Sequence, residues 1–177
     1  MSRKYKFHNP EGYYFVTFAV RHWVDVFTRP LYKDILVRNL RYCCKHKGLQ
    51  LAAWCIMTNH IHLVMRASDG ILPQDVLRDY KRFTSKAIVR AIRDNPRESR
   101  KEWMLNLFWN EEKQSFRFWR GDNQPIELWS NAVIDQKINY IHNNPVKEQF
   151  VSSAMDYVYS SARSFAGKKG LIDLEPL

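Results

Sequence analysis

Two histidines, His60 and His62, stand two positions apart in a segment that reads HIHLVM at residues 60–65. In an extended strand, side chains two residues apart point the same way and are spaced roughly 6.5–7 Å along the chain. The imidazoles therefore share one face of the predicted strand, and the other face carries the apolar residues Ile61, Leu63 and Met65. Two imidazoles at this spacing can bind one divalent metal ion if a third ligand comes from elsewhere. The alternative is a pair of strand histidines that only form hydrogen bonds.

A tyrosine and an asparagine one helical turn apart form the second candidate group. In a helix predicted over residues 131–143, a buried stripe at helical spacing consists of Ile134, Ile138 and Ile141. A separate polar stripe contains Gln136, Tyr140 and Asn144, so Tyr140 and Asn144 can address the same point in space. We expect Pro145 to end this helix, because proline disfavours helical backbone in the residue before it.

Tyrosine can act as a covalent nucleophile toward phosphate. A phenol is mostly protonated at neutral pH. A bound divalent ion helps by polarising the phosphate and neutralising charge that develops in the transition state. The alternative for Tyr140 is a packing role, in which its ring covers the core and its hydroxyl contacts water.

The elements that must position these residues follow from hydrophobic periodicity and turn signals. Strands are predicted over residues 13–20, 49–57, 60–67 and 115–119, and helices over residues 31–47, 72–95, 102–110 and 131–143. Gly48 stands where a helix C-cap glycine belongs. The resulting order predicts an α+β fold of the split ferredoxin-like kind, with an antiparallel sheet of four to five strands and helices on one face. The histidine face would then be the open side of the sheet.

Length, composition and charge bound the class of protein. The 177 residues predict one domain over residues 1–177, with a partly ordered tail from about residue 151. The composition of 45% hydrophobic and 26% charged residues predicts a soluble protein. Every apolar run is much shorter than the roughly 20 residues of a membrane span, so we expect no membrane partner. Three cysteines without a Cys-x-x-Cys motif favour a reducing cytoplasm and exclude a zinc ribbon.

The 28 basic against 18 acidic residues give a net charge of +10, which favours a partner that carries phosphates. The helix over residues 72–95 has a cationic face, on which Lys81 and Arg82 are the candidate contacts to the DNA backbone. The segment RFWR at residues 117–120 interleaves charge and rings, a pattern that suits stacking on unpaired bases. Trp119 and Trp129 can equally belong to the core.

Taken together, these motifs resemble those of a known family. MTNHIHLV at residues 57–64 resembles the His-hydrophobic-His motif of the HUH endonucleases, and YIHNNPV at residues 140–146 resembles the tyrosine motif of the REP-associated, single-tyrosine transposases. Further similar stretches are YFVTF at 14–18, KRFTS at 81–85, LW at 128–129 and YSSA at 159–162. The resemblance runs in order from about Tyr14 to about Arg163, and residues 111–123 depart from the family pattern.

The resemblance implies a ferredoxin-like or RRM-like HUH core. His60, His62 and Asn144 would bind a divalent metal, Mg²⁺ or Mn²⁺. Tyr140 would attack a phosphodiester of single-stranded DNA at hairpin-forming repeats, and the products would be a 5′-phosphotyrosine link and a free 3′-hydroxyl. Family members of this type are expected to act as monomers in the bacterial cytoplasm, on the DNA of the nucleoid, whereas relatives with a swapped tyrosine helix are dimers.

Two other functions fit the same residues. In the first, the protein is a metal-dependent nuclease or phosphoesterase in which His60 and His62 activate water and Tyr140 is structural. In the second, it is a non-catalytic nucleic-acid-binding domain with an inert histidine pair.

Overall fold

The computed structural model describes residues 7–122 and 125–177. Its centre is a four-stranded sheet in the order β2-β3-β1-β6, in which every neighbouring pair is antiparallel. The strands are β1 (Tyr13–Ala19), β2 (Leu49–Ile56), β3 (His60–Ala67) and β6 (Ile126–Leu128). β-Branched and aromatic residues make up most of β1 (YYFVTFA), as expected of a strand that packs on both faces.

Two long helices cover one face of this sheet. They are α1 (Pro30–His46) and α2 (Pro73–Asp94), and each begins with a proline, which suits the first helical position because that N–H has no partner within the helix. Gly48 follows α1 with a φ of +68°, which confirms its predicted role at the end of the helix. The apolar face of β3, with Ile61, Leu63 and Met65, packs into this layer as predicted.

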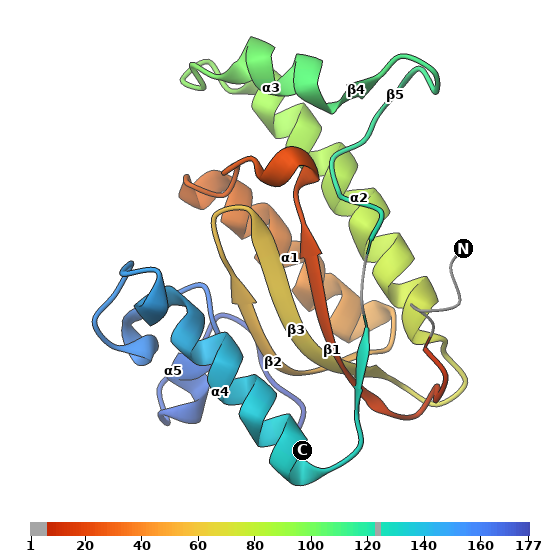
Figure 1. Ribbon diagram of the computed structural model, residues 1–177, viewed down its shortest axis with the longest axis vertical. Coiled ribbons are helices and arrows are strands. Elements are labelled where there is room, and N and C mark those ends of the chain that lie inside the picture. Colours follow the sequence, from red (N-terminus) through yellow and green to blue (C-terminus); the bar gives the residue numbers. More distant parts are fainter. Residues whose placement is uncertain (1–6, 123–124) are drawn as a thin grey trace.

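A third long helix, α4 (Asn131–Lys147), covers the opposite face of the sheet (Figure 1). It contacts β2, β3 and β6, and its residues Ile134, Ile138 and Ile141 join a second apolar cluster with Phe15 and Val64. Alternation along β1 decides which residue joins which layer. Phe15 faces α4, whereas its neighbours Tyr14 and Val16 face α1 and α2.

Short elements complete the described chain. A 3₁₀ turn, η2 (Arg21–Trp23), follows β1, and α3 (Lys101–Phe108) leads into a small hairpin of β4 (Trp109–Asn110) and β5 (Ser115–Phe116). After α4 come η3 (Ala154–Asp156) and α5 (Ala162–Phe165). The last segment returns to β2, where Ser160 bridges Cys55 and the Glu175 amide donates to Leu51 O. Across the described residues, every helix is too short or too polar to cross a bilayer.

The α+β class and the antiparallel sheet are confirmed, but the prediction that all helices lie on one face was wrong. α4 packs on the histidine face because three isoleucines on one of its sides need an apolar partner. The fourth strand of the sheet was also misplaced. It is Ile126–Leu128, whereas residues 115–119 pair only locally with β4 and through one bridge from Trp119 to Val20. Residues 1–6 of the predicted domain and residue 123 of the divergent segment lie outside the described residues.

Two further expectations were wrong in detail. Pro145 does not end α4, which continues to Lys147. Proline has no backbone N–H, so the last turn of the helix loses one hydrogen bond. The turn still closes, because the Glu148 amide donates to Asn144 O. Helical spacing predicts that Phe83 and Trp103 lie on the apolar faces of α2 and α3, yet both are exposed. The neighbouring residues Thr84 and Met104 are buried instead.

Candidate metal and nucleophile site

The imidazoles of His60 and His62 meet at their Nε2 atoms, which lie 3.1 Å apart. Both residues belong to β3, and the tilt of their rings closes the larger spacing of their backbones. His62 is buried and His60 is half-buried at the start of the strand. The two nitrogens most suited to bind a metal therefore point at a common position.

Asn59 fixes the protonation of His60. Asn59 Nδ2 donates to Trp23 O at 3.2 Å and to Asp25 Oδ1 at 3.0 Å, two atoms that can only accept. This leaves Asn59 Oδ1 facing His60 Nδ1 at 2.7 Å, and an amide oxygen cannot donate. His60 Nδ1 therefore carries the proton, and the Nε2 lone pair of a neutral His60 points toward His62.

Thr17 plays the corresponding part for His62. It lies directly opposite His62 in the β1–β3 pairing, and its Oγ1 is 2.7 Å from His62 Nδ1. On the other side of the ring, Asn144 Nδ2 lies 2.9 Å from His62 Nε2 and donates to its lone pair. His62 Nδ1–H then donates to Thr17, so the Nε2 atoms of both imidazoles are unprotonated and lie next to one another.

Burial keeps both histidines neutral. It lowers the pKa of His60 to about 4, against an opposing effect of the Asp25 carboxylate. Burial, and next the neighbouring His60, lower the pKa of His62 to about 3. Both rings are therefore uncharged at neutral pH, which is the form that binds metals.

The donor set fits a divalent ion. If two nitrogens each lie about 2.1 Å from one ion and subtend a right angle at it, they are about 3 Å apart. The two Nε2 atoms have nearly this spacing. Two unprotonated nitrogens at this distance repel one another, and a bound cation would remove that repulsion. A half-turn of the Asn144 amide would present Oδ1 to the same position, where it would be available as an oxygen ligand. Among the described residues, no cluster of three or more His, Cys, Asp or Glu side chains offers a competing metal site.

Helix α4 brings Tyr140 to this group. Its ring centroid lies 5.4 Å from that of His62 and 5.9 Å from that of Phe15, and its exposed fraction is 43%. Tyr140 and Asn144 lie four residues apart on α4, so both face the histidine side of the sheet. The Nζ atoms of Lys137 and Lys147 lie 5.9 and 5.5 Å from the centroid of the Tyr140 ring, which makes the surroundings of the phenol positive.

The other side of α4 is held by a histidine that the tyrosine motif also contains. His142 is buried, and its Nε2 lies 2.7 Å from Ser161 Oγ, which is in turn hydrogen-bonded to Trp54 N and O in β2. His142 therefore faces away from the histidine pair. Its contacts fix the rotation of α4 that turns Tyr140 and Asn144 toward His62.

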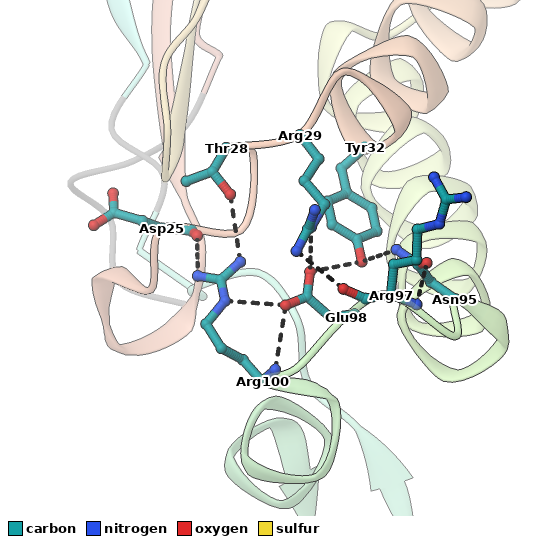
Figure 2. A network of polar contacts seen from close by, with 8 residues as sticks. All are labelled: Asp25, Thr28, Arg29, Tyr32, Asn95, Arg97, Glu98 and Arg100. Carbon is teal, nitrogen blue, oxygen red and sulfur yellow. Dashed lines mark hydrogen bonds and ion pairs between the residues drawn. The ribbon is translucent and has the colours of Figure 1, made fainter.

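The loop after β1 is held by a buried carboxylate (Figure 2). Glu98 accepts hydrogen bonds from Arg29 Nε, Arg100 Nε and the Tyr32 hydroxyl, each at 3.1 Å. Arg100 Nη1 also donates to the backbone oxygen of Asp25 at 2.8 Å. Because the Asp25 carboxylate holds Asn59, this network connects the α2–α3 junction to the orientation of His60.

The structure does not bring the predicted DNA contacts to this site. Lys81 and Arg82 lie on α2, on the opposite face of the sheet. Lys81 Nζ donates to Arg120 O at 2.8 Å, and burial lowers its pKa to about 8. Arg82 is exposed and lies 3.5 Å from Asp79. The expectation that the rings of residues 117–120 stack on bases was wrong, because Phe118 and Trp119 are buried in the core. Trp129, by contrast, is 80% exposed.

Several contributors to the site were not recognised from the sequence, among them Thr17, Asn59 and Lys137. Thr17 and Asn59 both occur in motifs that were singled out, but a role for either requires the strand register and the loop position. Lys137 stands one turn before Tyr140, a spacing that could have suggested proximity.

Comparisons with known proteins identify the family and the fold of the chain. A family model described as "Transposase IS200 like" matches residues 10–144. A Haemophilus influenzae protein, provisionally named a REP-associated tyrosine transposase, is 28% identical over 126 residues, and this match covers 67% of the chain and 61% of that relative. A solved structure described as a REP-associated tyrosine transposase bound to a REP hairpin superposes with a TM-score of 0.69 and 16% identity, covering 99% of this chain and 93% of the other. At that identity the superposition establishes the fold.

Proposed function

Because the chain belongs to the family of IS200-like transposases, we propose that it is a metal-dependent single-stranded DNA endonuclease and strand transferase with Tyr140 as the nucleophile. The observation that carries this proposal is the meeting of Tyr140 and Asn144 with His62, which lies 82 positions before Asn144 in the chain. A phenol beside a neutral histidine pair suits attack on a phosphodiester better than it suits a packing role.

In the proposed reaction, the Tyr140 oxygen forms a bond to phosphorus and the bond from phosphorus to the 3′-oxygen breaks. The proton of the phenol is lost to solvent, and the released 3′-oxygen takes up a proton. The 5′-phosphotyrosine link conserves the energy of the phosphodiester, so the 3′-hydroxyl of a strand can attack it in reverse and rejoin DNA. The reaction therefore needs no nucleotide cofactor.

His60, His62 and Asn144 would hold a divalent ion, Mg²⁺ or Mn²⁺. When bound, that ion supplies charge neutralisation and polarisation of the scissile phosphate. Lys137 and Lys147 add positive charge beside the Tyr140 ring, which favours an approaching phosphate. Thr17 and Asn59 keep the histidine rings oriented throughout.

The substrate that we propose is single-stranded DNA next to a hairpin-forming repeat, on the nucleoid of a bacterial cytoplasm. The net charge of +10 and the REP hairpin bound to the transposase of the superposed structure support this choice. We further propose that the protein acts as a monomer. Its own α4 packs on its own sheet, so Tyr140 reaches His62 without a second chain.

Adduct formation tests the proposal. The protein is incubated with Mn²⁺ and single-stranded hairpins taken from the DNA that flanks its gene, and the products are separated on a denaturing gel. We expect a covalent protein–DNA adduct with the wild type, none with Tyr140→Phe, and an unchanged yield with Tyr42→Phe. Tyr42 is a suitable control because its exposure of 51% is close to that of Tyr140 and it lies on α1.

Each remaining outcome favours another function. An adduct that survives in Tyr140→Phe means that a different residue is the nucleophile. Cleavage without an adduct indicates a nuclease in which the histidine pair activates water. Binding of these hairpins without cleavage indicates a nucleic-acid-binding domain.

A further inference from the structure

A hollow of about 560 Å³ opens beside His60, and the proposed reaction leaves it without a role. Its walls include the rings of Trp23 and Phe150 and the polar side chains of Asp25, Asn59 and Glu148. The volume lies within the range of about 300–1,000 Å³ that is typical of small-molecule sites. We propose that this hollow binds the base of the nucleotide on the 5′ side of the scissile phosphate, the one that keeps the released 3′-hydroxyl. This inference rests on the proposed function.

The position of the hollow relative to Tyr140 is the first argument. Four rings follow one another, with centroid distances of 6.1 Å from Trp23 to His60, 4.7 Å from His60 to His62, and 5.4 Å from His62 to Tyr140. Helix α4 gives the same order, because Glu148 in the wall lies eight residues, or about 12 Å of helical rise, beyond Tyr140. The hollow therefore adjoins His60 and Tyr140 adjoins His62, so the two lie next to different members of the histidine pair.

The geometry of phosphoryl transfer is the second argument. The attacking and leaving oxygens lie roughly in line on opposite sides of phosphorus. If the phosphate sits at the histidine pair and Tyr140 attacks from its side, the bond to the 3′-oxygen that breaks must point away from Tyr140. The nucleotide that carries this oxygen is thereby directed toward Trp23 and into the hollow.

The chemistry of the walls is the third argument, and it favours a base over a phosphate. Trp23 and Phe150 are exposed by 51% and 46%, and such rings provide stacking surfaces for unpaired bases. The carboxylates of Asp25 and Glu148 repel a phosphate, but they can accept hydrogen bonds from the amino groups of a base. The neutral rings and acidic groups thus match the uncharged base of a nucleotide and not its phosphate.

Trp23 is also held in place before any ligand arrives. His22 and Trp23 have φ values of +59° and +56°, a left-handed backbone that non-glycine residues keep only when their surroundings enforce it. The amide of Trp23 donates to Val20 O, its carbonyl accepts from Asn59, and the guanidinium of Arg120 lies 5.1 Å from its ring centroid. A fixed ring loses less freedom on binding, which suits a base-recognition site.

Binding measurements with Tyr140→Phe test the hollow without requiring cleavage. The probe is a fluorescein-labelled DNA hairpin with single-stranded adenine flanks, compared with the same hairpin whose flanks are abasic, in Mn²⁺. We expect the abasic flanks to weaken binding about tenfold. Adding Trp23→Ala or Phe150→Ala should reduce this difference to near unity, and Trp23→Phe should restore it. Trp103→Ala, on α3 and exposed by 54%, is the matched control and should keep the full difference.

If the Trp23→Ala and Phe150→Ala proteins still bind the abasic probe about tenfold more weakly than the adenine probe, the base site is overturned. A second measurement assigns the side of the cut. Wild-type protein is given hairpins with randomised flanks, and the released strands are sequenced from their 3′ ends. We expect a base preference at the terminal nucleotide that Trp23→Ala abolishes and Trp103→Ala preserves. A preference confined to the covalently attached strand contradicts the assignment of the hollow to the 5′ side of the cut. The absence of any adduct contradicts the proposed function and, with it, this assignment. The binding comparison then decides by itself whether the hollow recognises a base.

Discussion

The side-chain amide of Asn144 lies 2.9 Å from Nε2 of His62, a hydrogen bond that joins residues 82 positions apart. Asn144 is buried at the point where α4 meets β3, so its amide reaches the histidine pair rather than solvent. The same contact stabilises the last turn of the helix, where Pro145 removes one backbone hydrogen bond. One residue thus serves both the packing of α4 and the proposed metal site.

Substitution of Asn144 should change metal affinity in a direction set by the new side chain. Asn144→Ala removes the third donor, so the Kd for Mn²⁺ should rise by about tenfold or more. Asn144→Asp keeps an oxygen and adds negative charge, so Mn²⁺ should bind at least as tightly as to the wild type. Titration of the DNA-free protein, followed by electron paramagnetic resonance of free Mn²⁺, measures both. Asn143→Ala is the control, because Asn143 is exposed and its side-chain amide donates to Asn139 O. Equal losses at both positions would argue against a ligand role.

Thr17 should act on metal affinity through His62. Thr17→Val keeps the shape of the side chain but leaves His62 Nδ1 without its partner at 2.7 Å, so we expect a loss of about 10- to 100-fold in Mn²⁺ affinity. Thr17→Ser retains the hydroxyl and should restore most of the affinity. Calorimetric titration with Mn²⁺ distinguishes the two variants. Similar affinities for the valine and serine proteins would mean that the methyl group of Thr17, and not its hydroxyl, supports the site.

The two lysines beside Tyr140 should control the rate of adduct formation. Lys137→Met and Lys147→Met each remove positive charge near the phenol, so the single-turnover rate should fall roughly tenfold. The effect should shrink as salt is added, because the pair is partly exposed to solvent. Lys86→Met makes the same change in net charge at an exposed position on α2. A comparable slowing in that variant would assign the effect to overall charge.

Glu98 should make stability depend on pH in the acidic range. Burial alone raises the pKa of this carboxyl, but hydrogen bonds from Arg100, Tyr32 and Arg29 outweigh it and lower the pKa to about 2, from an ordinary value of 4.5. The ionised form is therefore favoured by folding. Its contribution, about 3 kcal/mol, is complete above pH 4.5 and is lost as the pH falls toward 2.

Urea unfolding between pH 2 and 7 measures this dependence, with Glu98→Gln as the comparison. The variant should be less stable at pH 7, because Arg29 and Arg100 lose their charged partner. Its free energy of unfolding should also vary less between pH 4.5 and 2 than that of the wild type. Parallel pH profiles for the two proteins would show that other carboxylates cause the acid dependence.

Much of the fold could be predicted because it depends on local pattern. The helices α1 and α2 and strands β1, β2 and β3 were placed to within a residue or two by periodicity, capping glycine and turn signals. The three-residue strand β6 was missed because so short a segment has no measurable period, and it becomes a strand only by pairing with β1. The segment 117–120 has the composition of a base-stacking surface, but packing against Phe27 and Thr84 places its rings in the core.

The sequence by itself determined that His60 and His62 share a face of one strand, since the alternation of side chains is a property of extended backbone. It also put Tyr140 and Asn144 one turn apart on a helix. Only the tertiary structure decided that α4 lies on the histidine face, that Thr17 stands opposite His62, and that Trp23 and not Trp119 offers its ring to solvent. Those relationships depend on strand register and helix docking, which are set by contacts between distant segments and leave no periodic signal in the chain.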